Sequence, residues 1–451
     1  MPGVYESENE NLEDQVNSPN PYNVTSENRF KILDSVITPL HMYSYNHQLN
    51  DIYQRISSVL KKLKSRMDSM GVDVMGDERG LVCELDYTRG SPLIDEYRNK
   101  DEFTIWPGVD GNRKTVGFLV GEPSKHRSVV CVEPDELKIT KRSHRLLAKL
   151  LQTYLRDHSP LDTCTDLSAD GNWRRFIVRS NNQGEHMLIA ILHPQNLSEE
   201  AINEEKERLK NYFQPYATEY QIRCFYFQAC RGVRCTHEEA PFQLIFGEET
   251  IEETINETTF ELSPESFFQV NTSAAAVLYN TVLEELNPSK LHTVVDVCCG
   301  IGAISLKVAP YVQRVIGIDQ SKVAIKDAQK NALKNGIRNC TFYNGYAEHI
   351  LPSFLSELSQ NRVVVTVNPG RGGLPQKVIK TIRSMECIEK VVYISCNPEG
   401  KAFNNFVDLM APEFRFDIEG HPFVATHAVP VHLFPNTTHC ELVISFERIL
   451  N

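Results

Sequence analysis

Apolar residues recur at two different periods along the first half of the chain. Between Tyr45 and Met70 they are spaced three and four residues apart, which predicts an amphipathic helix ending near Gly71. From about Leu81 to Leu262 short β-type runs separated by turn signals replace this pattern, with helices expected over Ser143–Asp157 and after Ser198. The clearest of the runs are Phe103–Trp106, Thr115–Val120, Ser128–Val132, Phe176–Arg179 and His186–Leu192. This middle region is predicted to be an α+β domain.

After Asn287 the pattern changes to alternating strands and helices. The expected strands are Thr293–Val297, Val315–Ile318, Val363–Val367, Val391–Ile394, Phe423–Val431 and Glu441–Phe446. The expected helices are Gly302–Tyr311, Lys322–Asn335, Leu374–Ser384 and Lys401–Met410. Such alternation predicts a Rossmann-like, mostly parallel, doubly wound α/β sheet with an antiparallel edge. Its active site is expected at the carboxyl ends of the strands.

These patterns divide the chain into four parts. Residues 1–35 are rich in acidic residues, Asn and Ser and poor in apolar residues, so we expect them to be disordered. A helical segment is expected over residues 36–75 and the α+β domain over residues 76–262. The α/β domain is expected over residues 263–451.

Composition narrows the choice of function class. The chain has 451 residues, of which 41% are hydrophobic and 24% charged, as in ordinary globular proteins. A net charge of −12 excludes a protein that binds nucleic acid by its overall charge, but not one with a local basic groove. No apolar stretch approaches the roughly 20 residues needed to span a bilayer, so no membrane partner is expected. The start resembles neither a secretory signal nor a transit peptide, and 12 cysteines are too dilute for a disulfide scaffold. We therefore expect an intracellular monomer, with cytosol, nucleus and mitochondrion left open.

A candidate cofactor site lies where the first α/β strand ends. Asp296 stands in that strand, the turn carries Gly300 and Gly302, and Asp319 ends the next strand. Glycines let the backbone approach a ligand closely, and a carboxylate after the second strand can accept both ribose hydroxyls. The pattern favours S-adenosylmethionine, with a nicotinamide cofactor or a plain structural turn as the alternatives. Asn368, before Pro369, ends a further strand and would reach the same pocket.

Two further residues could carry chemistry. Cys396 follows the strand Val391–Ile394 among polar neighbours, where a thiolate could act as a nucleophile, although buried cysteines are usually inert. Glu441 is either an edge charge or a positioned base, and His439 is equally ambiguous. The spacings of Cys224, Cys230 and Cys235 fit neither zinc nor an iron–sulfur cluster, so no metal and no cluster is expected.

Taken together, these motifs resemble those of the RNA uracil-C5 methyltransferases, specifically the animal homologues of the tRNA enzyme that makes 5-methyluridine. The resemblance runs from about Thr38 to Arg448. Besides the turn at Gly300 it rests on Tyr97–Phe103, Leu262–Asn271, Asn368–Leu374, Ser395–Pro398 and Leu433–Glu441.

The resemblance implies a role for individual residues. Cys396 would be the nucleophile, Glu441 the proton acceptor and Phe103 the aromatic that stacks on the target uracil. The residues implied to contact S-adenosylmethionine are Gln269, Gly300, Gly302, Asp319 and Asn368. Two positions depart from the family pattern, because Asn368 and Gly370 replace the first Asp and the second Pro of Asp-Pro-Pro-Arg and Cys298 replaces an aromatic.

The implied reaction is addition of Cys396 to carbon 6 of a uridine, methylation of carbon 5, and elimination assisted by Glu441. The implied substrate is the T-loop uridine of tRNA, with small-subunit rRNA as another possible RNA, and the resemblance implies that the α+β domain over residues 76–262 recognises this RNA. An RNA-folding protein with weak or lost catalysis is the alternative from another class. Basic residues that could contact phosphates, or simply form a solvated face, are Arg98, Lys100, Arg113, Lys114, Lys138, Lys141, Arg142, Arg145, Arg174 and Arg175.

Overall fold

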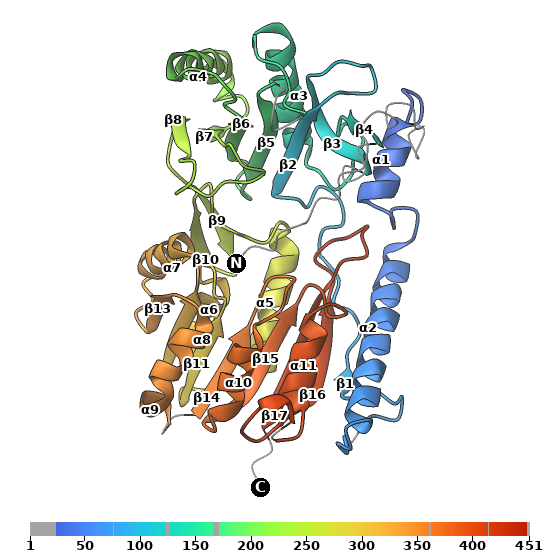
Figure 1. The fold of residues 1–451 in the computed structure, drawn as a ribbon, viewed down its shortest axis with the longest axis vertical. Helices are drawn as coiled ribbons and strands as arrows, with labels where there is room; N and C mark the ends of the chain where they lie inside the picture. The colour runs from blue at the N-terminus through green and yellow to red at the C-terminus, as the bar shows by residue number, and fades with distance from the viewer. Residues whose placement is uncertain are drawn as a thin grey trace.

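The computed structural model describes residues 24–74, 76–122, 127–165, 171–359, 362–413 and 415–448. Within these ranges the strands form an eight-stranded sheet, a seven-stranded sheet and a two-stranded hairpin. Figure 1 shows the two large sheets one above the other along the long axis of the molecule, with the hairpin between them. The larger sheet belongs to the C-terminal domain and the other to the central domain.

The C-terminal sheet has the order β1-β16-β17-β15-β14-β11-β12-β13. Its strands are β1 (Glu84–Leu85), β11 (His292–Val297), β12 (Arg314–Asp319), β13 (Cys340–Asn344), β14 (Arg362–Val367), β15 (Ile388–Ser395), β16 (Phe423–Val431) and β17 (Glu441–Arg448). Strands β11 to β15 are parallel, which confirms the predicted doubly wound sheet. The antiparallel strand β17 is not at the edge, because β16 and then β1 continue the sheet beyond it. Sequence reasoning also missed the short strand β13.

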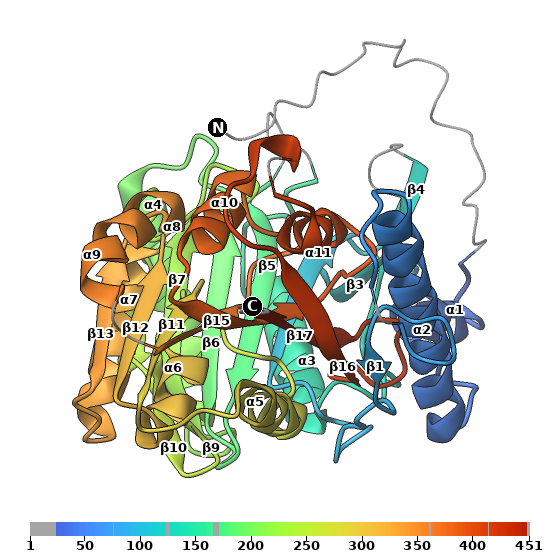
Figure 2. The same cartoon turned by 90° about the horizontal axis from the view of Figure 1, so that it is seen from below.

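Helices cover both faces of this sheet, as the near-continuous apolar strands require. Alternate residues of β11 separate the two faces: Val295 and Val297 pack with one set of helices, and Val294 with the other. The first set is α2 (Tyr45–Asp68), α10 (Gln376–Ser384) and α11 (Ala402–Met410). The second set is α5 (Thr272–Leu286), α6 (Ala303–Val308) and α7 (Lys322–Lys334), while the short helices α8 (Ala347–Ile350) and α9 (Leu355–Leu358) follow β13. Figure 2 shows α10 and α11 on one side of the sheet and α5 and α6 on the other.

The N-terminal part of the chain belongs to this domain more than the sequence suggested. The amphipathic helix α2 has the predicted extent, but its apolar stripe packs against α11 and the C-terminal sheet instead of forming a separate segment. Strand β1, expected in the central domain, pairs in parallel with β16. An amphipathic helix needs an apolar surface against which to bury its apolar face. Here α11 and the apolar face of β16 provide that surface.

The expected disordered segment also ends earlier than predicted. Residues 1–23 lie outside the described residues, but α1 (Arg29–Ile37) begins within the stretch assigned to disorder. Leu33 is 1% exposed and packs with Val120 and Val132 of the central sheet. The prediction of disorder rested on the acidic composition of the segment, which does not show that a few apolar side chains such as Leu33 can pack against the central sheet.

The central domain is α+β, as predicted. Its sheet has the order β4-β3-β2-β5-β6-β7-β8, built from β2 (Lys100–Trp106), β3 (Thr115–Glu122), β4 (Arg127–Val132), β5 (Trp173–Ser180), β6 (His186–Leu192), β7 (Ile222–Ala229) and β8 (Gln243–Gly247). Helices α3 (Arg142–Asp157) and α4 (Glu199–Phe213) cover one face. Side chains of β2 alternate, so Phe103 and Ile105 enter this helix-covered core while Lys100 and Glu102 take the other face.

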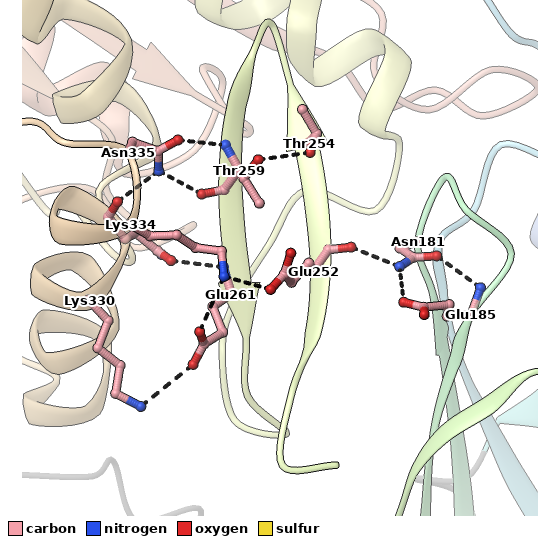
Figure 3. A network of polar contacts seen from close by, with 10 residues as sticks. Asn181, Glu185, Glu252, Thr254, Thr259, Glu261, Lys330, Lys334 and Asn335 are labelled. Carbon is pink, nitrogen blue, oxygen red and sulfur yellow. Dashed lines mark hydrogen bonds and ion pairs between the residues drawn. The ribbon is translucent and has the colours of Figure 1, made fainter. Parts of the chain in front are cut away.

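The hairpin of β9 (Ile251–Ile255) and β10 (Thr258–Leu262) links the two domains (Figure 3). On one side Lys334 of α7 forms an ion pair with Glu252 at 2.5 Å, and Asn335 bonds to both backbone groups of Thr259. On the other side the Asn181 amide of the central domain donates to the backbone oxygen of Glu252 at 2.8 Å. Polar contacts to both domains therefore hold the hairpin between them.

Candidate active site

One large pocket of about 980 Å³ lies between the domains at the carboxyl ends of the parallel strands. The chain runs from β11 to β12 on one side and later to β14 on the other, so the pocket sits at the topological switch point of the sheet. Its walls contain most of the predicted site residues, namely Cys396, Glu441, Gln269, Gly300, Asp319 and Asn368. The structure thus brings these predicted site residues together in one pocket.

The glycine turn after β11 forms part of the pocket wall. Gly300 has a φ of +55°, and a Cβ atom there would have no atom within 4 Å, so the turn leaves open space beside its backbone. Gly302 has a φ of +85° and does not line the pocket; a Cβ atom there would lie 3.2 Å from Phe342. The two glycines therefore differ in function, since Gly300 faces the pocket and Gly302 allows close packing behind it.

The two aspartates of the cofactor motif also take different positions. Asp319 lies in the pocket wall at the end of β12, where its carboxylate accepts the backbone N–H groups of Gly300 at 2.9 Å and Ser321 at 2.8 Å. Asp296 is fully buried outside the wall, and its carboxylate accepts the hydroxyl groups of Ser305 at 2.6 Å and Thr366 at 2.8 Å. Burial raises the pKa of Asp296 to about 6. Asp319 is available to a ligand, whereas Asp296 holds the first turn of α6 against β14.

The residues around Asp319 fit the adenosine part of S-adenosylmethionine. The wall combines this carboxylate acceptor and the open turn at Gly300 with the apolar side chains of Ile301 and Val323. The carboxylate can accept hydrogen bonds from the ribose hydroxyls, the open turn lets the backbone approach the ligand closely, and the apolar side chains can contact the adenine ring. Gln269, which is 7% exposed, lies in the same pocket, and its backbone oxygen accepts the Asn99 amide at 2.8 Å.

Strand register brings the predicted nucleophile and base together. Cys396 directly follows β15, Glu441 is the first residue of β17, and the neighbouring residues Ser395 and Leu442 are paired across these antiparallel strands. Cys396 and Glu441 therefore occupy the next position along the same ladder, at the end that opens into the pocket. Forty-four residues separate them in the sequence, so only the sheet makes them neighbours.

Burial dominates the electrostatics of this pair. It raises the pKa of Glu441, whose side chain is 5% exposed, to about 8. Burial also raises the pKa of the Cys396 thiol, the charge of Glu441 raises it further, and the positive charge of Arg371 opposes both effects. At neutral pH a protonated Glu441 leaves Cys396 without a negative neighbour, so Arg371 can favour the thiolate.

Arg55 of α2 contacts the loops that carry both residues. Its guanidinium donates to the backbone oxygen of Thr438 and to the Cys440 sulfur at 3.0 Å, directly before Glu441. It also forms an ion pair at 3.5 Å with Glu399, three residues after Cys396. Sequence reasoning missed Arg55, because nothing in a regular helical pattern distinguishes one surface arginine from another.

Comparison with known proteins identifies the family. A family model described as tRNA (Uracil-5-)-methyltransferase matches residues 91–442. The chain belongs to this family. It is 39% identical over 423 residues to the human tRNA (uracil-5-)-methyltransferase homolog B, covering 92% of this chain and 84% of that protein. It is 36% identical to the mouse homolog A over 92% of this chain and 68% of that protein.

A solved structure supports the fold of this methyltransferase. The Pyrococcus abyssi tRNA (uracil-54, C5)-methyltransferase, in complex with S-adenosyl-L-homocysteine, aligns with a TM-score of 0.62 and 21% identity. The alignment covers 90% of this chain and 84% of the archaeal chain. Family membership makes this chain an S-adenosylmethionine-dependent RNA methyltransferase. None of the helices in the described ranges combines the length and apolar character needed to cross a bilayer.

The structure of the methyltransferase corrects the prediction for Phe103. This side chain is 0% exposed and lies in the core of the central domain, on the face of β2 that α3 and α4 cover, so it has no free surface for a base. Phe267 is instead 70% exposed and lines the pocket, two residues before Gln269. The sequence identified the motif around Gln269, but only the fold shows that Phe267 is the aromatic side chain of this motif that is exposed to the pocket.

The cysteines outside the pocket form no metal site that the structure reveals. Among the described residues, no group of three or more His, Cys, Asp or Glu side chains is arranged to hold a metal ion. Cys230 and Cys235 form a disulfide, and Cys224 is a buried free thiol. The Cys230–Cys235 disulfide was not predicted, because the number of cysteines in a chain does not indicate whether one short-range disulfide forms.

Proposed function

We propose that this methyltransferase modifies carbon 5 of the T-loop uridine in tRNA. The observation that carries the proposal is the position of Cys396 and Glu441 directly beyond the Ser395–Leu442 pair of the β15–β17 ladder, in the wall of the pocket that also contains Gly300 and Asp319. A half-buried thiol beside a buried carboxyl group suits a substrate whose carbon must first be activated and then deprotonated. The similarity to the human and mouse tRNA (uracil-5-)-methyltransferase homologs supports tRNA as the RNA.

The proposed reaction begins with Cys396. Its thiolate adds to carbon 6 of uracil, so that a bond forms between Sγ and carbon 6 and the electron pair of the double bond makes carbon 5 nucleophilic. S-adenosylmethionine, when bound, would supply the methyl group: carbon 5 forms a bond to it while the sulfur–methyl bond breaks, and S-adenosylhomocysteine leaves with that electron pair. The Glu441 carboxylate then takes the proton of carbon 5, the double bond re-forms, and the electron pair of the Sγ–carbon 6 bond returns to Cys396.

The uridine must leave its stack to reach Cys396. Phe267, exposed on the wall of the pocket, offers the unstacked base an aromatic surface. Asp319, Gly300, Gln269 and Asn368 are proposed to hold the cofactor beside it. The amide of Asn368, which replaces the family's carboxylate, can still accept and donate hydrogen bonds. We propose that the reaction needs neither a metal ion nor an iron–sulfur cluster.

The test is incubation of unmodified tRNA transcripts with the protein and S-adenosylmethionine, followed by nucleoside mass spectrometry. We expect 5-methyluridine at the T-loop position, and its absence would contradict the proposed activity. A small-subunit rRNA fragment in a parallel reaction separates the two RNA classes. Cys396→Ala should form neither product nor a covalent RNA adduct and should still bind tRNA, whereas Cys387→Ala, at a cysteine outside the pocket wall, should stay active.

A further inference from the structure

A basic loop lies on the central domain beside the pocket. Residues 230–235, between β7 and β8, read Cys-Arg-Gly-Val-Arg-Cys, and the two cysteines at their ends form a disulfide. The side chain of Arg234 is 76% exposed, Val233 is 66% exposed, and Arg231 is also exposed. The loop therefore presents two guanidinium groups to solvent within a closed ring of six residues.

The central domain holds the backbone of this loop with its carbonyl oxygens turned inward. The Gly232 oxygen accepts from Arg174, the Val233 oxygen accepts from Arg175 at 2.5 Å, and the Arg231 oxygen accepts from the His193 ring at 3.0 Å. Three successive acceptors are thereby occupied by the protein. An anion that approaches from solvent meets the arginine side chains and not these oxygens.

Positive charge connects the loop with the pocket. Lys100 and Glu102 share the face of β2 that lies opposite the helices, and Glu102 pairs with both Arg175 and Arg234. Burial, followed by the charges of Arg179, Arg234 and Arg98, lowers the pKa of Lys100 to about 7 while Glu102 opposes them. Arg98 itself lines the pocket. The basic side chains of Arg98 in the pocket wall, Lys100 in β2 and Arg234 in the loop thus form a row from the pocket to the loop.

The chain after the loop also reaches the pocket. The backbone N–H of His237, two residues beyond Cys235, donates to the Glu265 carboxylate at 2.9 Å, and Glu265 lines the pocket. Two carboxylates, Glu102 and Glu239, lie beside the loop against the four arginines 174, 175, 231 and 234. Four arginines therefore gather in and against the loop, although the whole chain carries a net charge of −12.

We propose that residues 230–235 form a phosphate-binding loop for the RNA whose target nucleotide enters the pocket, and that the Cys230–Cys235 disulfide holds this loop in its binding shape. The inference rests on the proposed function, because it assigns the loop to that RNA. A short ring fixes the spacing of Arg231 and Arg234 before RNA arrives, so less conformational entropy is lost on binding. Guanidinium groups suit phosphate because they bind it in a bidentate manner.

Reduction of the disulfide is then expected to weaken RNA binding. A dithiol reductant supplies two electrons and two protons, the bond between the sulfur atoms of Cys230 and Cys235 breaks to give two thiols, and the reductant becomes a disulfide. The opened loop keeps its charges but loses their fixed arrangement. The effect should therefore be smaller than that of removing the arginines.

The first experiment compares Arg231→Gln/Arg234→Gln with the wild type in binding an unmodified tRNA transcript. We expect the dissociation constant to rise roughly tenfold, and the slope of its logarithm against the logarithm of salt concentration to fall by about 1 per lost phosphate contact. Arg314→Gln/Arg362→Gln removes the same charge at the amino ends of β12 and β14, away from the pocket, and should leave both quantities unchanged. Equal binding by the wild type and the loop variant would overturn the proposal.

The second experiment tests the disulfide with Cys230→Ser/Cys235→Ser in the absence of reductant. We expect weaker tRNA binding and unchanged cofactor binding by calorimetry, and added dithiol should bring the wild type to the level of this variant without affecting the variant. Identical affinities in all four states would overturn the role of the disulfide. Failure of the wild type to methylate tRNA would instead contradict the proposed function. The failure of the proposed loop and the failure of the proposed function are therefore distinguishable.

Discussion

The surroundings of Glu441 change the chemistry of its carboxyl group. Its carboxyl group is buried at the start of β17, and burial raises its pKa to about 8. If it acts only after methyl transfer, Glu441→Gln should still allow Cys396 to attack and carbon 5 to be methylated. Elimination should stall, because the amide cannot accept the proton. We expect a stable protein–RNA band that carries label from the methyl group, with little free product. Multiple turnover by the variant would show that another group removes the proton.

The same pKa predicts how product release depends on pH. The carboxylate is the form that accepts the proton, and its fraction increases as pH rises through about 8. Release of 5-methyluridine from the adduct should therefore accelerate over about pH 6 to 9 and level off above the pKa of Glu441. Rapid-quench measurements of adduct decay would show this curve. A rate independent of pH over that range would contradict the assignment.

Asp319 is expected to control cofactor affinity. Replacing it with Ala removes the carboxylate proposed for the ribose hydroxyls and also the acceptor for the Gly300 N–H. The dissociation constant for S-adenosylmethionine should rise tenfold or more, on the order of 1.4 kcal/mol or above. Asp319→Asn keeps an acceptor oxygen and should lose less. Titration calorimetry measures both, and an unchanged constant for Asp319→Ala would place the ribose elsewhere.

At the scale of the element, helix α2 does more than cover the C-terminal sheet. Its apolar stripe fixes its position, and Arg55 then extends from it to Thr438, Cys440 and Glu399. One side chain thus contacts the loop before Glu441 and the loop after Cys396. A positioning role for Arg55 follows from this geometry, because both loops end at the pocket.

We expect Arg55→Gln to reduce kcat roughly tenfold to a hundredfold, since small displacements of reacting groups are costly. The dissociation constants for tRNA and cofactor should change little, because Arg55 is not among the residues that line the pocket. Arg55→Lys should restore part of the rate by keeping the pair with Glu399. Lys61→Gln, on an exposed position of the same helix, is the matched control. A normal kcat for Arg55→Gln would exclude the positioning role.

At the scale of the whole molecule, the pocket depends on two domains that the β9–β10 hairpin holds together. Asn181 is central to this link: it is 2% exposed, and its amide nitrogen donates to the Glu252 oxygen and to the Glu185 carboxylate, both at 2.8 Å. Its side-chain oxygen accepts the backbone N–H groups of Gln183 and Glu185. Removal of this side chain takes four part-buried hydrogen bonds from the groups that it contacts.

Asn181→Ala should therefore lower the free energy of unfolding by about 1–3 kcal/mol. Asn182→Ala, next to it but with an exposed side chain, should change it by less than about 0.5 kcal/mol. Urea denaturation followed by circular dichroism compares the two variants. Equal midpoints for Asn181→Ala and Asn182→Ala would mean that the hairpin does not depend on this contact.

Local sequence alone determined the elements of the C-terminal sheet and the chemistry at its strand ends. Apolar runs such as those of β12 and β15 are long enough to specify buried strands, and the residues at their carboxyl ends, Asp319 and Cys396, must lie at the same edge of a parallel sheet. The mostly parallel sheet and the position of the pocket at the carboxyl ends of its strands follow from the alternating pattern. These features depend on interactions between residues close in the chain.

Tertiary structure decided the features that depend on distant partners. The register of β15 with β17 placed Cys396 beside Glu441, and the apolar surface of the C-terminal sheet recruited α2 and with it Arg55. The same effect explains the error at Phe103, because alternation along β2 shows that neighbouring side chains face opposite sides but not which side the helices cover. Burial, and with it the pKa of Glu441, arises only when segments far apart in the sequence exclude water from one carboxyl group.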